Sequence, residues 1–389
     1  MNRRHFFTTA AAFACAPQLR AAEHDLVIHG GRVIDPGRKI DALLDVAVRG
    51  GRIAAVRAGI SASSAAQAID ARGQIVVPGL VDIHLHARDA QLAPPEILST
   101  GVTTMVDAGS RGADNVDQLI DIARNAPNRM RILLNIARLG NNPGGRGEFL
   151  DSLEPADVAK ARAAIQKHRQ WIVGIKARLS RGVSAERDLD VLRRAVQAAG
   201  PLPIMIHIGD TNSPLPQVLA LLRKGDIVTH MYAPTQHGIM DANGQVLPEV
   251  RLARRRGVRF DFGNGLNEHW SWEVAESGLK QGFPPDTITS DLVYQAGADQ
   301  VFDLPTVLSK FLQMGMPLSQ VLACATSSAA ATFRDLSSYG SLRPGAPADI
   351  SVLELTQGNF EFVDNYKGKR LGTQKLVARA VVAGGKRVA

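Results

Sequence analysis

Residues 76–89 read VVPGLVDIHLHARD, and the pattern of the chain changes within this stretch. Before Pro78, short apolar segments alternate with turn residues such as Gly30-Gly31 and Gly50-Gly51, which is typical of antiparallel strands. After Gly79, short apolar cores alternate with helical stretches of about 10–15 residues, the pattern of repeated βα units. The stretch therefore marks the point where a strand-rich region ends and an α/β region begins.

The α/β region contains eight β-rich cores, with plausible helices between them at 157–169, 185–199 and 215–224. The cores are VDIHLHA (81–87), VTTMVDAG (102–109), RILLNIA (131–137), IVGIKARLS (172–180), PIMIHIG (203–209), IVTHMYA (227–233), VRFDFGNG (258–265) and DTITSD (286–291). This number of units over roughly 250 residues predicts a (β/α)8 TIM barrel. A doubly wound open sheet would show the same alternation, but no glycine-rich phosphate loop follows the first core.

Strand-like segments return after Ser341, as GSLRPGAPADISVLEL, FEFVD and LVARAVVAGGKRV. The two strand-rich regions flank the barrel in the sequence, so we predict that they form one small β-sandwich. The predicted domains are therefore residues 23–77 together with 341–389 for the sandwich, and residues 78–340 for the barrel.

The first 22 residues have the order of an export signal: a basic start, a short apolar stretch and small residues at Ala21 and Ala22. Arg3 and Arg4, followed by Phe6 and Phe7, resemble a twin-arginine signal. We therefore expect export to a bacterial periplasm. A frayed basic terminus is the alternative interpretation.

The composition excludes several classes of protein. A hydrophobic content of 45% and a charged content of 21% are those of a globular chain. Two cysteines exclude a disulfide-stapled scaffold. No apolar run after the signal reaches the roughly 18 residues of a membrane helix. The net charge is +8, but an aromatic content of 5% argues against a nucleic-acid surface.

Polar side chains collect near the C-terminal ends of the predicted barrel strands, where barrel enzymes place their chemistry. They are His84, His86, Lys176, His207, His230 and Asp291. His84 and His86 are two residues apart on one strand, so their side chains leave the same face. Buried together, these groups would be badly desolvated unless a cation joined them. Four imidazoles and a carboxylate suit a pair of divalent ions. Zinc is the first expectation, because it prefers ligands of these types.

Lys176 does not fit this set as a cation, because an ammonium group cannot bind a metal ion. A buried lysine loses its proton readily, and the neutral amine can react with carbon dioxide. The resulting carbamate is an anionic bridge for two metals roughly 3.5–4 Å apart. We therefore predict that Lys176 is carboxylated.

Each of these residues also has a structural interpretation. A lone strand histidine can be a hydrogen-bonded core residue, a lysine can extend along the surface to water, and Asp291 can cap a helix. The joint arrangement on successive strands favours the metal site.

The segment VVPGLVDIHLHARD, with GIK at 174–176, the two single histidines and TSD at 289–291, resembles the amidohydrolase superfamily. The resemblance covers the whole chain after the signal. The stretches VRFDFGNG, DTITSD and VFDLPTVLSKFLQMGMP are most similar to the dihydroorotase-related deacetylase branch. Members of that branch often carry a histidine where this chain has Asn264.

The resemblance implies a role for each predicted ligand. His84 and His86 would bind the more buried metal together with Asp291. His207 and His230 would bind the more exposed metal, and carboxylated Lys176 would bridge the two. Members of the branch use a bridging hydroxide to hydrolyse amide or ester bonds, and Asp291 would be the general base of that reaction.

The predicted function is hydrolysis of a small acylated, carboxylate-bearing compound, such as an N-acyl amino acid or an O-acyl hydroxy acid. A cyclic amidase of the dihydroorotase or hydantoinase kind and a non-catalytic binding protein are the alternatives. The protein could act as a homo-oligomer.

Arg88 completes a His-x-His-x-Arg arrangement, and the resemblance to dihydroorotases implies that it grips a substrate carboxylate through a bidentate contact. Arg178, two residues beyond Lys176, is a second candidate. For each, a salt bridge to a neighbour such as Asp89 is the alternative. Asn135, Tyr232 and Asn264 are predicted to line the pocket. His269 and Trp270, in the loop 264–272, are expected to serve local packing.

Overall fold

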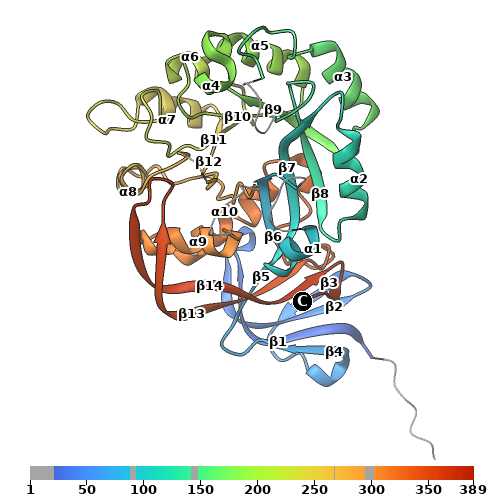
Figure 1. The fold of residues 1–389 in the computed structure, drawn as a ribbon. Helices are drawn as coiled ribbons and strands as arrows, with labels where there is room; N and C mark the ends of the chain where they lie inside the picture. Colours follow the sequence, from blue (N-terminus) through green and yellow to red (C-terminus); the bar gives the residue numbers. More distant parts are fainter. Residues whose placement is uncertain (1–21, 88–92, 142–147, 267, 294–301) are drawn as a thin grey trace, which may run out of the picture.

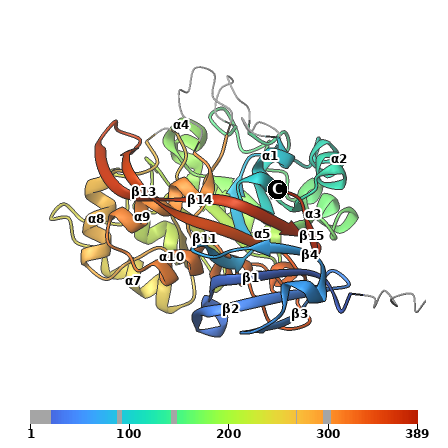
Figure 2. The same ribbon diagram turned by 90° about the horizontal axis from the view of Figure 1, so that it is seen from below.

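The structure is a computed structural model that describes residues 22–87, 93–141, 148–266, 268–293 and 302–389. It contains two sheets (Figures 1 and 2). Among the described residues, no helix is both long and apolar enough to cross a membrane. The predicted export signal and Arg88 lie outside the described residues.

The first sheet has seven parallel strands in the order of the sequence. They are β6 (Leu80–Leu85), β7 (Val102–Gly112), β8 (Arg129–Asn135), β9 (Ile172–Arg178), β10 (Ile204–His207), β11 (Ile227–Thr229) and β12 (Arg259–Asp261). Their central residues are almost all buried, as expected for parallel strands covered on both faces. The first seven cores of the predicted barrel therefore form strands of one curled sheet.

The eighth core, 286–291, forms no strand, although it lies between the two edges of this sheet. The Phe262 amide donates to Thr287 O at 3.0 Å, and the Asp291 amide donates to His84 O at 2.7 Å. Asp291 has a φ of +46°, which takes the backbone out of the extended conformation. The segment thus bonds to both β12 and β6, but with too few regular pairs to count as a strand.

Helices follow the strands and cover the outside of the seven-stranded sheet (Figure 1). They are α1 (Pro94–Ser99), α2 (Asp117–Asn125), α3 (Val158–Lys167), α4 (Arg181–Ser184), α5 (Asp188–Ala199), α6 (Leu215–Ala220), α7 (Pro248–Arg255), α8 (Trp272–Lys280), α9 (Leu304–Gln313), α10 (Leu318–Cys324) and α11 (Ser327–Ala330). Their buried residues, such as Val191 and Ala195 on α5, pack against the strands in one large core.

The second sheet has eight strands and is built from both ends of the chain, as predicted. They are β1 (His24–Asp35), β2 (Ile40–Arg49), β3 (Arg52–Arg57), β4 (Ala65–Asp70), β5 (Ile75–Pro78), β13 (Ile350–Val363), β14 (Lys369–Ala383) and β15 (Lys386–Arg387). Strand β5 joins the two chain ends, because it pairs with β1 on one side and with β13 on the other. Hydrogen bonds connect all eight strands into one sheet.

Gly79 is the single residue between β5 and β6, so it connects the two sheets. A Cβ atom at this position would lie 2.2 Å from Thr103 Oγ1, which is far inside contact distance. Only glycine allows the chain to pass so close to β7. The chain therefore passes from one sheet to the other at the Pro78-Gly79 pair.

Candidate functional site

The six predicted ligands meet at the C-terminal ends of the parallel strands. The donors come from β6 (His84), the residue after β6 (His86), β9 (Lys176), β10 (His207), the residue after β11 (His230) and the 286–292 segment (Asp291). His84, Lys176 and His230 are each at most 2% exposed, and Asp291 is 4% exposed. The structure thus brings together the residues that the strand-end pattern selected.

Asp291 lies at the centre of this cluster. Its Oδ1 is 3.2 Å from His84 Nε2 and 3.3 Å from His86 Nε2, and its Oδ2 is 3.8 Å from His230 Nε2. Burial raises the pKa of this carboxyl, but the neighbouring His84 charge and the imidazole hydrogen bonds outweigh it and hold the pKa well below its usual value. The carboxylate is therefore ionised, as a metal ligand must be.

Two residues of the cluster have left-handed backbones, with φ of +63° at His230 and +46° at Asp291. Such a conformation costs of the order of 1–3 kcal/mol for a residue other than glycine. The surrounding hydrogen bonds hold it: His230 Nδ1 lies 2.9 Å from Gly263 O, and the Asp291 amide donates to His84 O. Backbone strain of this kind is common at functional sites, where it orients the side chain.

The imidazoles are oriented through their Nδ1 atoms. His84 Nδ1 lies 2.9 Å from Thr229 Oγ1 and 3.4 Å from Asp261 Oδ2. His86 Nδ1 lies 2.8 Å from Ser110 Oγ, which donates in turn to Asp107 Oδ2. These contacts leave the Nε2 atoms of both rings facing Asp291. The same arrangement fixes the tautomer of histidines that bind metals.

Asp261 is the most connected of these supporting residues, and sequence reasoning did not select it. It is fully buried and accepts hydrogen bonds from the hydroxyls of Thr229, Thr287 and Thr289 at 2.6–3.0 Å. A buried aspartate in an apolar strand needs such partners. The aspartate within the apolar segment VRFDFGNG was therefore the sequence signal that could have identified Asp261.

We expect Asp261→Asn to weaken zinc binding about 10- to 100-fold, because the amide holds His84 less firmly than the carboxylate does. Equilibrium dialysis against zinc would measure this change. Thr287→Ser, which keeps the hydroxyl that donates to Asp261, is the matched control and should bind zinc like the wild type. Equal zinc affinity in Asp261→Asn and the wild type would contradict this role.

Lys176 is buried in an environment that disfavours its charge. Its Nζ lies 3.0 Å from His84 Nε2 and 3.5 Å from Met205 Sδ. Burial lowers the pKa of the amine to about 8, against the opposing effect of Asp291. About a tenth of the amine is therefore neutral at pH 7, and this is the form that reacts with carbon dioxide.

The residues of the cluster fit a metal centre. His84, His230 and Asp291 each offer a ligand atom within 4.8 Å of the others, and so do His207, His230 and His269. Loss of hydration holds the pKa values of His207 and His230 well below the ordinary value, so both rings are neutral and can donate electron pairs. A buried carboxylate among imidazole Nε2 atoms is a ligand set for zinc.

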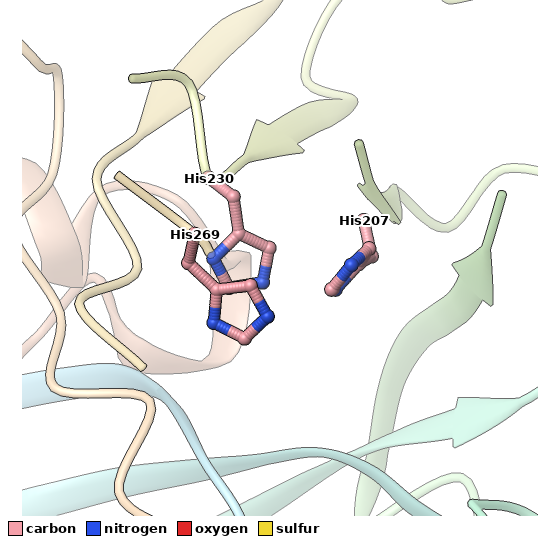
Figure 3. Close-up of side chains that lie close together, drawn as sticks. All are labelled: His207, His230 and His269. Atoms are coloured by element: carbon pink, nitrogen blue, oxygen red, sulfur yellow. The ribbon is translucent and has the colours of Figure 1, made fainter. Parts of the chain in front are cut away.

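His269 also reaches the cluster, although the sequence suggested only local packing for it. Its ring stacks on that of His230, with centroids 3.9 Å apart, and lies at 5.1 Å from the ring of His207 (Figure 3). Its Nδ1 is 3.3 Å from Asp291 Oδ2. Trp270, by contrast, is fully buried against Phe262 and Trp272.

The predicted substrate-binding residues have different surroundings. Arg178 pairs with Glu148 at 2.8 Å and keeps part of its side chain exposed. The Asn135 amide donates to Gly109 O and to Asn141 Oδ1. Tyr232 is fully buried, and its hydroxyl donates to Phe283 O, so its contacts are those of a core residue.

Asn264 is buried and accepts a hydrogen bond at 2.8 Å from Lys310. The Lys310 ammonium also donates to Val363 O, and it lies over the rings of Phe302 and Trp270 at 4.3 and 4.8 Å. Burial lowers the pKa of Lys310 to about 7, partly opposed by Asp364. Sequence reasoning did not select this lysine, which lies on α9.

Lys310 predicts a pH dependence of stability. Between its folded pKa of about 7 and its unfolded value of about 10.4, the unfolded chain binds more protons at this site. The free energy of unfolding of the wild type should therefore rise with pH relative to Lys310→Met, by at most about 1.4 kcal/mol per pH unit. Denaturant titrations of both proteins from pH 6 to pH 10 measure the difference. A difference that does not change with pH would contradict the prediction.

Comparisons with known proteins agree with the geometry. Residues 75–388 match the Amidohydrolase family. A deacetylase of Enterococcus faecalis is 29% identical over 93% of this chain and 98% of its own length. A deacetylase of Agrobacterium fabrum is 29% identical over 82% of this chain and 81% of its own length.

Solved structures show the same fold. The crystal structure of an adenine deaminase is 30% identical, with a TM-score of 0.84 over 94% of this chain and 99% of the other. That of a dihydroorotase is 27% identical, with a TM-score of 0.84 over 94% of this chain and 97% of the other. The resemblance inferred from VVPGLVDIHLHARD is confirmed. The chain belongs to the amidohydrolase family, and it is a hydrolase that acts on amide bonds.

Proposed function

We propose that the protein is a binuclear-metal hydrolase that removes the acyl group from a small compound bearing a carboxylate. The observation that carries the proposal is the position of Asp291, whose two oxygens face three imidazole Nε2 atoms beside the buried Lys176. An N-acyl amino acid or an O-acyl hydroxy acid is the proposed substrate. The two relatives named deacetylase support the choice of an acyl group.

The residues divide into two sites around the proposed bridge. The more buried ion would be held by His84, His86 and Asp291. The more exposed ion would be held by His207 and His230, and carboxylated Lys176 would bind both ions. When bound, such ions lower the pKa of water to near 7 and polarise a substrate carbonyl. Zinc is the proposed metal, because imidazoles and carboxylates suit it.

Asp291 moves the proton in the proposed reaction. Its carboxylate is ionised, so it can take the proton of the attacking water. As the bond to the acyl carbon breaks, the same group delivers that proton to the leaving amine or alkoxide. Its Oδ2 lies 3.8 Å from His230 Nε2 and 3.3 Å from His269 Nδ1.

A carboxylate on the substrate would be held by arginine. Arg178 ends β9 two residues after Lys176, and its pairing with Glu148 uses one side of the guanidinium. We propose Arg88 as the principal contact, because it follows His86 by two residues and its guanidinium suits bidentate binding.

A panel of acylated compounds tests the proposal. The zinc-loaded protein should hydrolyse N-acetyl amino acids or O-acetyl hydroxy acids, and it should prefer the free acids to their amides or methyl esters. Equal rates for the acids and for their neutral derivatives would contradict the proposed contact between arginine and the substrate carboxylate. Absence of hydrolysis across the panel would contradict the proposed function.

A cyclic amidase is the second candidate, and the similarity to a dihydroorotase structure over almost the whole chain favours it. The same panel should therefore include dihydroorotate and a hydantoin. If ring opening has a higher kcat/KM than every open-chain deacylation, the protein is a cyclic amidase and not a deacylase.

We also propose that the 286–292 segment closes the seven-stranded sheet into a (β/α)8 barrel. Its bonds to β12 and to β6 support this arrangement. In this arrangement residues 78–340 form the barrel domain, and residues 23–77 with 341–389 form the second domain, a β-sandwich.

The N-terminal residues support a further proposal, that the protein is exported to the periplasm. Replacement of Arg3 and Arg4 by lysine should keep the chain in the cytosol with its N-terminus intact, because the twin-arginine pair is the part of the signal that is recognised. Cell fractionation followed by N-terminal sequencing would show the result. A wild-type chain found uncleaved and only in the cytosol would contradict export.

A further inference from the structure

His269 contacts the oxygen of Asp291 that lies away from His84 and His86. The inner oxygen, Oδ1, already contacts His84 and His86 at 3.2 and 3.3 Å. The outer oxygen, Oδ2, has His269 Nδ1 at 3.3 Å, which is closer than His230 Nε2 at 3.8 Å. The side chain of His269 is 20% exposed and stacks on the His230 ring (Figure 3).

Gly265 makes this contact sterically available. It has a φ of +55°, and a Cβ atom there would lie 1.8 Å from His269 Nδ1 and 2.7 Å from Asp291 Oδ2. No other residue fits between the two side chains without moving one of them. The loop therefore places a bare backbone where His269 and Asp291 meet.

The loop that carries His269 is held by the turn 363–368, which joins β13 to β14 in the terminal sheet. The His269 amide donates to Asn365 Oδ1 at 2.9 Å, and Asn365 Nδ2 donates to Gly265 O at 3.2 Å. The Trp272 amide donates to Asp364 Oδ2 at 3.0 Å, and its indole donates to Gly368 O at 2.9 Å. Figure 1 shows the long β13–β14 hairpin extending from the terminal sheet to the start of α8.

The turn is itself internally bonded. Asp364 Oδ1 accepts from the amides of Tyr366 and Gly368 at 2.9 and 2.7 Å, and the Asp364 amide donates to Gly368 O at 3.0 Å. Lys310 adds a link from α9, since its ammonium donates to Val363 O and to Asn264 Oδ1. Such a bonded turn can hold the loop in one position.

We propose that His269 is a positioning residue for Asp291, and that Asn365, in the turn of the β13–β14 hairpin, sets the place of His269. The proposal rests on the proton transfer by Asp291 proposed above. It gives the terminal sheet a part in the reaction: one of its turns fixes the orientation of the carboxylate that moves the proton.

Three variants at position 269 test the first step. Asparagine places an amide near the position of Nδ1, glutamine places one near Nε2, and alanine removes both. We expect His269→Ala to lower kcat about 10- to 100-fold with a much smaller change in KM. His269→Asn should restore most of kcat, and His269→Gln should not. Restoration by glutamine but not by asparagine, or an unchanged kcat in His269→Ala, would overturn the proposal.

Asn365 tests the second step through a double-mutant cycle. Asn365→Ala should lower kcat in the wild-type background and should have little further effect in His269→Ala, because it acts through His269. Asn365→Asp, which keeps the acceptor for the His269 amide, should be closer to the wild type. Tyr366→Ala, in the same turn with a side chain 46% exposed, is the control and should not change kcat. Additive losses in the double mutant would overturn this step.

Two further measurements do not depend on turnover and so separate this proposal from the proposed function. Crystal structures should show the Asp291 carboxylate rotated in His269→Ala relative to the wild type. Hydrogen exchange of the segment 264–272 should be faster in Asn365→Ala but not in Tyr366→Ala. An unmoved carboxylate and unchanged exchange would overturn the proposal. If both changes are seen in the variants but the wild-type protein hydrolyses none of the substrates, only the proposed function is contradicted.

Discussion

Asp291→Asn is expected to lower kcat by about 10²–10⁴-fold while the protein keeps much of its metal. The physical reason is that an amide can no longer take a proton from the attacking water or pass it to the leaving group. Its remaining oxygen can still bind an ion held by His84 and His86, whose Nε2 atoms lie 3.2 and 3.3 Å from Asp291 Oδ1. Steady-state kinetics on the fastest substrate of the panel, with metal analysis of the same samples, would measure both effects.

The leaving group provides a control for this prediction. An activated aryl ester releases an anion that needs little protonation, whereas an amide releases an amine that must be protonated. The loss in Asp291→Asn should therefore be larger for an N-acetyl amino acid than for an aryl acetate. A metal-replete variant with unchanged turnover of the amide would remove Asp291 from the reaction.

Lys176→Ala is expected to lose both metal and activity, with turnover at least about a thousandfold lower. A two-oxygen anion between two cations contributes several kcal/mol, and each 1.36 kcal/mol in the barrier is a factor of ten. The variant also leaves an empty space beside His84, since the Lys176 Nζ lies 3.0 Å from His84 Nε2. Acetate or propionate can enter that space, so either acid should restore part of the activity in the presence of zinc.

Lys176→Met is the matched control, because its side chain fills the space of the lysine stem and lacks the amine. It should be as inactive as Lys176→Ala, and the same carboxylic acids should not rescue it. Zinc titration and turnover with and without the acids would separate the two variants. A Lys176→Met protein that binds two metal ions and turns over normally would contradict the bridging role of Lys176.

Much of the fold could be predicted from the sequence, because its elements follow from local patterns. Strands β7 and β9 begin at the predicted residues Val102 and Ile172. Helix α3 begins directly after Asp157, whose side chain accepts from the Lys160 amide as an N-cap. Residues Ala185–Arg187 form a short 3-10 turn, and helix α5 begins after it at Asp188, because the φ of +47° at Ala185 lies outside the α-helical region.

The eighth core was harder to predict, because its hydrogen bonds serve the site more than the sheet. Thr287 and Thr289 donate to Asp261, and the Ser290 hydroxyl donates to Asp82. Its last residue, Asp291, has a left-handed backbone. The alternating pattern of DTITSD thus indicated the location of the segment but not its irregular geometry.

The candidate site was also predictable only in part. The strand-end positions of His84, Lys176 and Asp291 are visible in the sequence, because parallel strands end at one rim. The place of His269 is not visible, since its loop is held by Asn365, which lies 96 residues further along the chain. Contacts of this range depend on the tertiary fold and leave no periodic signal.

X-ray diffraction from zinc-loaded crystals grown with bicarbonate, with data on both sides of the zinc absorption edge, tests the central claim most directly. We predict two anomalous peaks beside Asp291 and electron density for a carboxylate attached to Lys176 Nζ, lying between the peaks. A bare amine at Lys176, with no pair of anomalous peaks between the histidines, would contradict the account.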